Sequence, residues 1–178
     1  IDGRDVMPDV RAELAKIRGF VPRVHEGRVP GSRGARFPDV VSIGIGGSDL
    51  GPRLVTEALR PFHGNISCHY VANVDPADLQ GTLLELDPGS TLFIVCSKSF
   101  RTEETLTNSL AARNWLLNAG AVESDLDKHF IAVTANLAAA AEHLGEKWPD
   151  VDQGRHPEIE RHRERVVRVV VDGDHHLV

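Results

Sequence analysis

Short apolar runs alternate with amphipathic stretches through the middle of this chain. Four runs are predicted to be strands, at residues 39–47, 67–73, 90–97 and 129–136, and each precedes a predicted helix, at residues 49–62, 75–86, 102–120 and 137–145. The runs are nearly continuous rather than alternating, which is typical of strands covered on both faces of a parallel sheet. With right-handed crossovers, the pattern predicts an α/β fold: a doubly wound, open parallel sheet flanked by helices, in flavodoxin-like layering.

Two amphipathic stretches carry an apolar stripe at helical spacing, which predicts one buried face for each helix. The stripe positions are Val10, Leu14, Ile17 and Phe20 in the first stretch, and Leu54, Val55, Ala58 and Leu59 in the second. The first stretch forms one helix or two short ones, and Pro22 is expected to end or kink it.

The pattern divides the chain into three parts. Residues 1–36 are interpreted as a helical lead-in and a loop rich in Gly, Pro and Arg, and residues 37–145 as the α/β domain. Residues 146–178 form an atypical tail, in which arginine and histidine are frequent and the strand–helix alternation stops. Within the tail, Asp172-Gly173 favours a hairpin.

Composition and charge argue against nucleic acid and membrane as binding partners. The 178 residues carry a formal net charge of −6, so no basic excess is available for binding nucleic acid. No apolar run is long enough to span a bilayer, and residues 1–10 contain no signal-peptide core, so a cytoplasmic protein is expected. Cys68 and Cys96, the two cysteines, are expected to be buried free thiols in a reducing compartment.

The first candidate site is the glycine-rich turn "IGIGGSDLGP" at residues 43–52. Gly46 and Gly47 would let a ligand approach the backbone, and Ser48 offers a hydroxyl at the start of a helix that attracts anions. A tight turn with a Ser or Asp cap explains the same residues without a ligand. The spacing matches neither G-x-G-x-x-G nor a P-loop, and Asp75, placed where a ribose-binding acid would sit, is better explained as a helix cap.

The second candidate site is "CSKSFRTEETLTN" at residues 96–108. It places four hydroxyls and one lysine between a buried strand and a helix; these residues are Ser97, Lys98, Ser99, Thr102 and Thr105. Hydroxyls, backbone N–H groups and a helix N-terminus are the groups that bind phosphate. An elaborate N-cap explains one hydroxyl and the glutamates that follow, so the pattern favours a phosphate cradle. No Ser-His-Asp set, metal triad or carboxylate pair stands out, and the catalytic residues are therefore unknown.

Four blocks of this sequence resemble the glucose-6-phosphate isomerase (phosphoglucose isomerase) family. They are "DGRDVMPDVRAEL", "VVSIGIGGSDLGPRLVTEAL", "STLFIVCSKSFRTEETLTN" and "KHFIAVTAN", in family order between about residue 2 and Gly145. The resemblance implies a sugar-isomerase (SIS) domain with a five-stranded parallel sheet. It also implies interconversion of glucose 6-phosphate and fructose 6-phosphate through a cis-enediol, without a metal or organic cofactor, in a cytoplasmic homodimer.

The resemblance assigns roles to individual positions. Ser97, Lys98, Ser99 and Thr102 match the family's sugar-phosphate loop, with Ser99 standing where threonine is usual. Gly47 and Ser48 match residues that contact the bound sugar. These six positions are the expected substrate-binding residues for a hexose phosphate.

The sequence also departs from the family. The family's glutamate base, ring-opening histidine and late lysine lie farther along than this chain extends, and Gly154 and Arg155 only faintly echo the Gly-Gly-Arg block. The tail is therefore interpreted as not being family sequence, and the chain is expected to be inactive alone. Two alternatives stay open: a non-catalytic sugar-phosphate-binding module and a dinucleotide-binding module.

Overall fold

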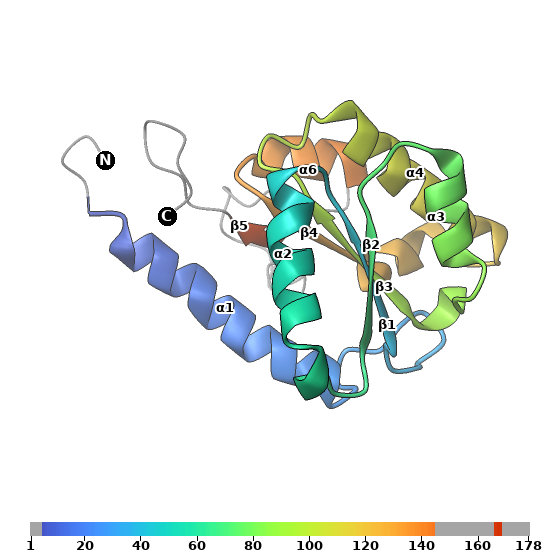
Figure 1. Ribbon diagram of the computed structural model, residues 1–178, viewed down its shortest axis with the longest axis horizontal. Coiled ribbons are helices and arrows are strands. Elements are labelled where there is room, and N and C mark those ends of the chain that lie inside the picture. Colours follow the sequence, from blue (N-terminus) through green and yellow to red (C-terminus); the bar gives the residue numbers. More distant parts are fainter. Residues whose placement is uncertain (1–4, 145–165, 169–178) are drawn as a thin grey trace.

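A computed structural model describes residues 5–144 and the backbone of residues 166–168 (Figure 1). The helices are α1 (Met7–His25), α2 (Gly47–Ala58), α3 (Pro76–Leu83), α4 (Glu103–Asn118), α5 (Leu126–His129) and α6 (Leu137–Leu144), with short 3₁₀ turns at Arg60–Phe62, Pro88–Ser90 and Glu123–Asp125. The strands are β1 (Asp39–Ile43), β2 (Ser67–Val71), β3 (Thr91–Cys96), β4 (Phe130–Thr134) and β5 (Val166–Arg168).

The strands form one parallel sheet in the order β2-β1-β3-β4-β5. Val41 of β1 lies between His69 of β2 and Phe93 of β3. After β1 the chain forms β2 at one edge of the sheet. The strands β3, β4 and β5 then follow on the other side of β1. This is the flavodoxin-like order, whose switch point lies between β1 and β3, and it confirms the predicted α/β fold.

Apolar side chains form a core on both faces of the central strands, because successive residues of a strand point to opposite faces of the sheet. Alternate strand residues, with Phe93 and Val95 of β3 among them, join α3, α4 and α6 in the larger apolar cluster. The intervening residues, such as Leu92 and Ile94, join the C-terminal end of α1 and the segment leading into β1 in a smaller cluster. The sheet is thus covered by helices from two sides, with α3 and α4 together in Figure 1.

Helix α1 extends away from the body of the domain (Figure 1). The predicted helix exists, but the predicted buried face does not: Leu14 and Ile17 are exposed, Val10 and Phe20 are half-buried, and only Val24 is buried. Pro22 does not end the helix, which continues to His25. Pro22 cannot donate an i→i−4 hydrogen bond, and α1 continues for only three residues beyond it.

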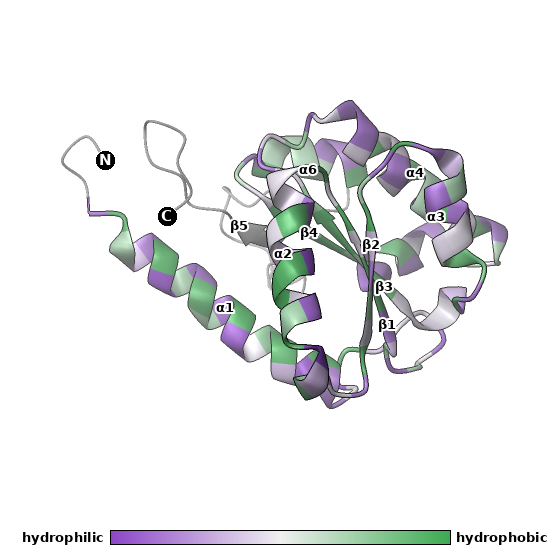
Figure 2. Ribbon diagram, in the orientation of Figure 1, coloured by the Kyte–Doolittle hydropathy of each residue, from purple (hydrophilic) through white to green (hydrophobic). Residues whose placement is uncertain are grey.

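Helix α2 also exposes the apolar stripe that was predicted to be buried. Leu54, Val55 and Leu59 are 70%, 57% and 50% exposed, and Ala58 is exposed too. Figure 2 shows hydrophobic positions along the outer side of α2 as well as in the strands. The periodicity identified an apolar face correctly, but no other described element covers that face.

The two cysteines differ from expectation and from each other. Cys68 is exposed because β2 is an edge strand, whereas Cys96 in the central strand β3 is half-buried. Desolvation raises the pKa of both thiols, and the effect is large for Cys96, the less exposed of the two. The prediction of two buried thiols is therefore wrong for Cys68, although both cysteines are free.

Part of the tail belongs to the sheet. Residues Val166–Arg168 form β5, which pairs with β4 in parallel, so the strand pattern does not stop at Gly145 as expected. The predicted hairpin at Asp172-Gly173 and the rest of the tail lie outside the described residues, and the three-part division of the chain stays a prediction. In the described part of the chain, no helix combines the length and apolarity that crossing a membrane requires.

Candidate functional site

A pocket of about 570 Å³ lies where the switch point places a ligand crevice, at the carboxyl ends of β1 and β3. Three connections supply its walls: β1 to α2, β3 to α4, and β4 to α6. The lining residues are Ile45, Ser48, Cys96, Ser97, Lys98, Ser99, Thr102, Thr105, Ala135 and Asn136. The structure thus brings together five of the six predicted site residues around one cavity.

The sixth predicted residue, Gly47, is not among the lining residues but begins α2 beside Ser48. An added Cβ at Gly47 would meet no atom within 4 Å, so its backbone is approachable. Gly46 has φ 58 and ψ −121, a conformation that L side chains rarely adopt. Glycine is therefore required at Gly46 by the turn itself.

No side chain caps the start of α2, so the Ser or Asp cap that could have explained the glycine turn is absent. Asp49 is buried and faces Arg53 instead, with its Oδ1 2.9 Å from Nη2 of Arg53. The hydroxyl of Ser48 lines the pocket. The first turn of α2 therefore contributes a hydroxyl to the cavity and places the N-terminal end of the helix beside it.

In the connection between β3 and α4, backbone amides of the connection itself donate hydrogen bonds to the serine hydroxyls. The N–H of Phe100 donates to Oγ of Ser97 at 3.1 Å, and the N–H of Arg101 donates to Oγ of Ser99 at 3.3 Å. Oγ1 of Thr102 lies 3.3 Å from Oγ of Ser97. Because each serine oxygen accepts an amide hydrogen, its hydroxyl hydrogen can be donated elsewhere.

Thr102 occupies the N-cap position of α4 but makes no side-chain hydrogen bond to the first turn. The interpretation of this loop as an elaborate N-cap is therefore wrong. By contrast, Oδ1 of Asp75 accepts the N–H of Ala77 at 2.9 Å at the start of α3, so the predicted cap there is confirmed. Both helices that begin at the pocket, α2 and α4, thus lack the side-chain cap that α3 has.

The end of β4 closes the third side of the pocket. The N–H of Ala135 and Oγ1 of Thr134 donate to the carbonyl oxygen of Lys98, at 3.0 and 3.2 Å. Nδ2 of Asn136 donates to the carbonyl oxygen of Ser99 at 3.1 Å. These bonds fix the loop backbone against a neighbouring strand. Sequence reasoning did not select Asn136 as a site residue; the signal was an amide side chain directly after a buried strand.

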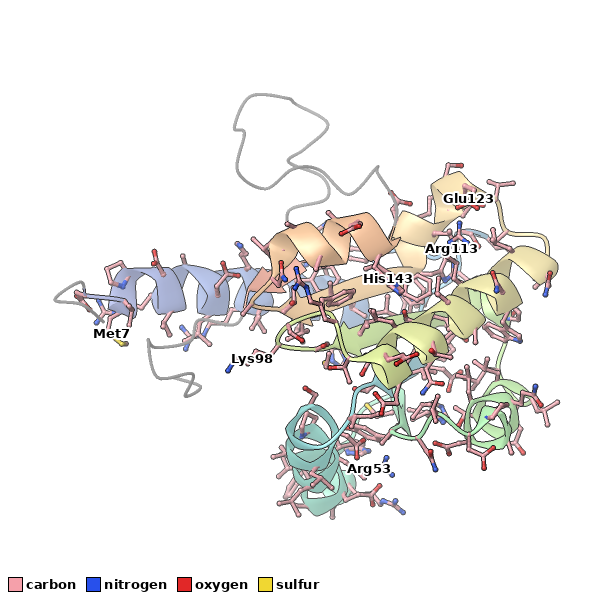
Figure 3. The ribbon with its side chains drawn as sticks, turned by 90° about the horizontal axis from the view of Figure 1, so that it is seen from above. Met7, Arg53, Lys98, Arg113, Glu123 and His143 are labelled. Carbon is pink, nitrogen blue, oxygen red and sulfur yellow. The ribbon has the colours of Figure 1, made fainter. Side chains whose placement is uncertain are left out.

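The electrostatics of the pocket favour an anion. Lys98 is exposed and extends outward from the domain in Figure 3, so its charge lies at the mouth of the pocket. The positive ends of the α2 and α4 dipoles reinforce it. Burial raises the pKa of Cys96 to about 11, against the smaller effect of its hydrogen bond with Ser42, so this wall stays neutral at physiological pH. None of the lining residues is Asp, Glu or His.

Within residues 5–144 and 166–168, no group of three or more His, Cys, Asp and Glu side chains could hold a metal ion. The lining of the pocket offers hydroxyls, amides, one neutral thiol and one ammonium group.

Comparison with known proteins identifies the family. The phosphoglucose isomerase family model matches residues 1–147. The chain belongs to the phosphoglucose isomerase family. Both turns that line the pocket lie inside the matched range, which confirms the resemblance found in the sequence.

Curated relatives of this chain are named glucose-6-phosphate isomerase. The chain is 53% identical over 141 residues to a glucose-6-phosphate isomerase of Hahella chejuensis, covering 79% of this chain and 25% of the relative. It is 52% identical over 143 residues to that of Shewanella amazonensis, covering 80% of this chain and 26% of the relative. The chain thus spans about a quarter of the length of the curated relatives it matches.

Solved structures resemble the fold. A glucose-6-phosphate isomerase from Chlamydia trachomatis superposes with a TM-score of 0.65 at 24% identity, covering 93% of this chain and 27% of the other. A hypothetical protein from Thermus thermophilus gives a TM-score of 0.58 at 30% identity, covering 79% and 31%. The first of these likenesses supports the fold alone.

Proposed function

We propose that this chain supplies the sugar-phosphate-binding part of a glucose-6-phosphate isomerase. The complete protein would interconvert glucose 6-phosphate and fructose 6-phosphate by ring opening and proton transfer between C1 and C2. The observation that carries the proposal is the pocket at the switch point, where serine and threonine hydroxyls, one lysine and two helix N-termini converge. A phosphate monoester, with about −1.5 to −2 charges at neutral pH, matches that set of donors.

The proposed roles divide between the two turns. Ser97, Ser99 and Thr102 would donate hydroxyl hydrogens to the phosphoryl oxygens, and Lys98 would neutralise their charge. Gly47 and Ser48 would contact the sugar, since the backbone at Gly47 is open. Phosphate binding far from C1 and C2 would anchor the substrate while other groups act on the reacting carbons.

Turnover would require residues from the rest of the protein. Proton transfer between C1 and C2 needs a base, and none of the pocket's lining residues is a carboxylate or an imidazole. We therefore propose that the 178-residue chain binds hexose phosphates and turns over little or none. The homodimer, the cytoplasmic location and the absence of a cofactor implied by the resemblance belong to the same proposal.

Calorimetric titration of the 178-residue chain tests the binding. We expect heat from glucose 6-phosphate and fructose 6-phosphate, and none from glucose or NAD. Lys98→Ala and Ser99→Ala should each weaken binding by about 10- to 150-fold, since a hydrogen bond to a charged group is worth about 1.5–3 kcal/mol. Lys128→Ala is the matched control, because Lys128 pairs with Asp125 away from the pocket lining. Equal binding by the Lys98 and Lys128 variants would contradict the assignment.

A coupled assay from fructose 6-phosphate tests the activity. Robust turnover by the 178-residue chain would refute the proposed inactivity. A non-catalytic sugar-phosphate-binding module also fits a lining without acid or base groups. It would bind hexose phosphates even when the full-length protein shows no isomerisation.

A further inference from the structure

One bulky residue in the β3–α4 turn has a strained backbone. Among the described residues, Phe100 is the one non-glycine residue with positive φ, at 50°. This conformation is unfavourable for a residue with a Cβ, and it persists where surrounding contacts determine it. The Phe100 side chain is 1% exposed, within the larger apolar cluster. Packing of the ring therefore holds the backbone in place.

The Phe100 ring packs against His143, which in turn lies beside Ser109. The ring of His143, from α6, meets that of Phe100 edge-on at a centroid distance of 5.9 Å. Oγ of Ser109, from α4, donates to the carbonyl oxygen of Leu106 at 2.9 Å and lies 2.6 Å from Nε2 of His143. The hydroxyl of Ser109 therefore links α4 to the His143 ring. Figure 3 shows His143 between α6 and α4.

The strained residue and its neighbour supply the two amides that hold the serine hydroxyls. The N–H of Phe100 reaches Ser97, and the next N–H, of Arg101, reaches Ser99. If φ of Phe100 became negative, the N–H of Arg101 would turn away from Oγ of Ser99, and the position of the buried ring fixes where the N–H of Phe100 meets Oγ of Ser97. The position of the pocket's hydroxyl donors is thus tied to the burial of one aromatic ring.

We propose that Phe100 is a positioning residue: its buried ring, clamped by the Ser109–His143 pair, sets Ser97 and Ser99 for phosphate binding. This inference rests on the proposed function, since it assigns the control of the same pocket. Phe100 itself does not touch the ligand. A change at Phe100 should therefore alter affinity through the loop, beyond any effect on overall stability.

The test compares Phe100→Leu with Phe130→Leu in the full 178-residue chain. Phe130 is a matched control because it is also buried in the larger cluster, at the opposite end of the sheet, and is 2% exposed. Amide hydrogen exchange at residues 100 and 101 reports loop order, and calorimetry with glucose 6-phosphate reports binding. We expect faster exchange and about tenfold weaker binding for the Phe100 variant only, as a small misplacement of binding groups produces.

The outcomes separate the two proposals. Unchanged exchange and affinity in Phe100→Leu, at a melting temperature matched to Phe130→Leu, would overturn the inference while leaving the proposed function intact. No binding of glucose 6-phosphate or inorganic phosphate by the unaltered chain would overturn the proposed function, and the exchange data would still decide the loop-ordering role. Should Phe100→Leu fail to fold, Ser109→Ala loosens the same clamp and must speed exchange at residues 100 and 101 for the inference to stand.

Discussion

Two strand-to-helix turns line one pocket, and each contains a residue with positive φ just before its helix. In the β1–α2 turn this residue is Gly46, with φ 58, and in the β3–α4 turn it is Phe100, with φ 50. Glycine adopts this conformation without steric cost, and an added Cβ at Gly46 would meet no atom within 4 Å. Phenylalanine needs its buried ring to compensate. One turn is therefore set by local backbone preference, and the other by tertiary packing.

The two turns also contribute different chemical groups to the pocket. The glycine turn leaves backbone accessible and contributes one hydroxyl, from Ser48, to the pocket. The packed turn presents several side-chain donors whose positions depend on α4 and α6. We expect the glycine turn to tolerate changes in the core and the packed turn to be sensitive to them.

The largest expected effect comes from removing the Phe100 ring. Phe100→Ala and Phe100→Gly should each lower the free energy of unfolding by about 3–5 kcal/mol, the usual cost of truncating a buried aromatic side chain. The glycine variant should be the more stable by about 1 kcal/mol, because it adopts φ 50 without strain. Urea denaturation measures both values.

Phe130 provides the control for this ordering, because its backbone is extended, with φ −120 and ψ 140. There the order should reverse, with Phe130→Gly less stable than Phe130→Ala by about 0.5–1 kcal/mol. The same order at both positions would show that the backbone of Phe100 is unstrained.

A smaller loss is expected at the glycine turn. Gly46→Ala should lower the free energy of unfolding by about 1–3 kcal/mol, since alanine must adopt an unfavourable conformation. Gly47→Ala is the neighbouring control: its φ is not positive, so its stability should be unchanged or raised by at most about 1 kcal/mol. Chemical denaturation of both variants tests the difference. Equal losses would mean that space, rather than φ, makes glycine necessary there.

The smallest expected effect is a pH dependence of stability caused by His143, whose ring packs against Phe100. Burial lowers the pKa of His143, so below about pH 6.5 the unfolded chain binds more protons at this residue than the folded chain. His143 therefore contributes stability that is complete above pH 6.5 and is lost as the pH falls toward its folded-state pKa. Melting temperatures between pH 7.5 and 5 should fall more steeply for the unaltered chain than for His143→Gln. Parallel curves would remove His143 as the cause.

Much of the fold follows from the sequence because the central strands are buried on both faces. Residues 92–96 and 130–133 are apolar throughout, and such runs have few alternatives to an inner parallel strand. The stripes of α1 and α2 were misjudged because periodicity shows that a face is apolar without showing what covers it. Leu54 illustrates this, since it is 70% exposed.

The candidate site was predictable where its chemistry is carried by side chains in one short segment. Ser97, Ser99 and Thr102 could be selected because three hydroxyls directly follow a buried strand. Asn136 was not selected, because its role depends on a contact with the carbonyl oxygen of Ser99, 37 positions earlier. The strain at Phe100 was equally hidden, since an aromatic residue in a loop gives no sign of its φ.

The strand order has a consequence for changing what this domain binds. The hollow at the ends of β1 and β3 arises from chain connectivity, because the chain departs from these adjacent strands in opposite directions. Exchanging the residues of the two turns would give the hollow a different chemical lining without removing it. Abolishing it would require the strands to be joined in another sequence, so ligand choice and the existence of a binding cavity are separately adjustable in this architecture.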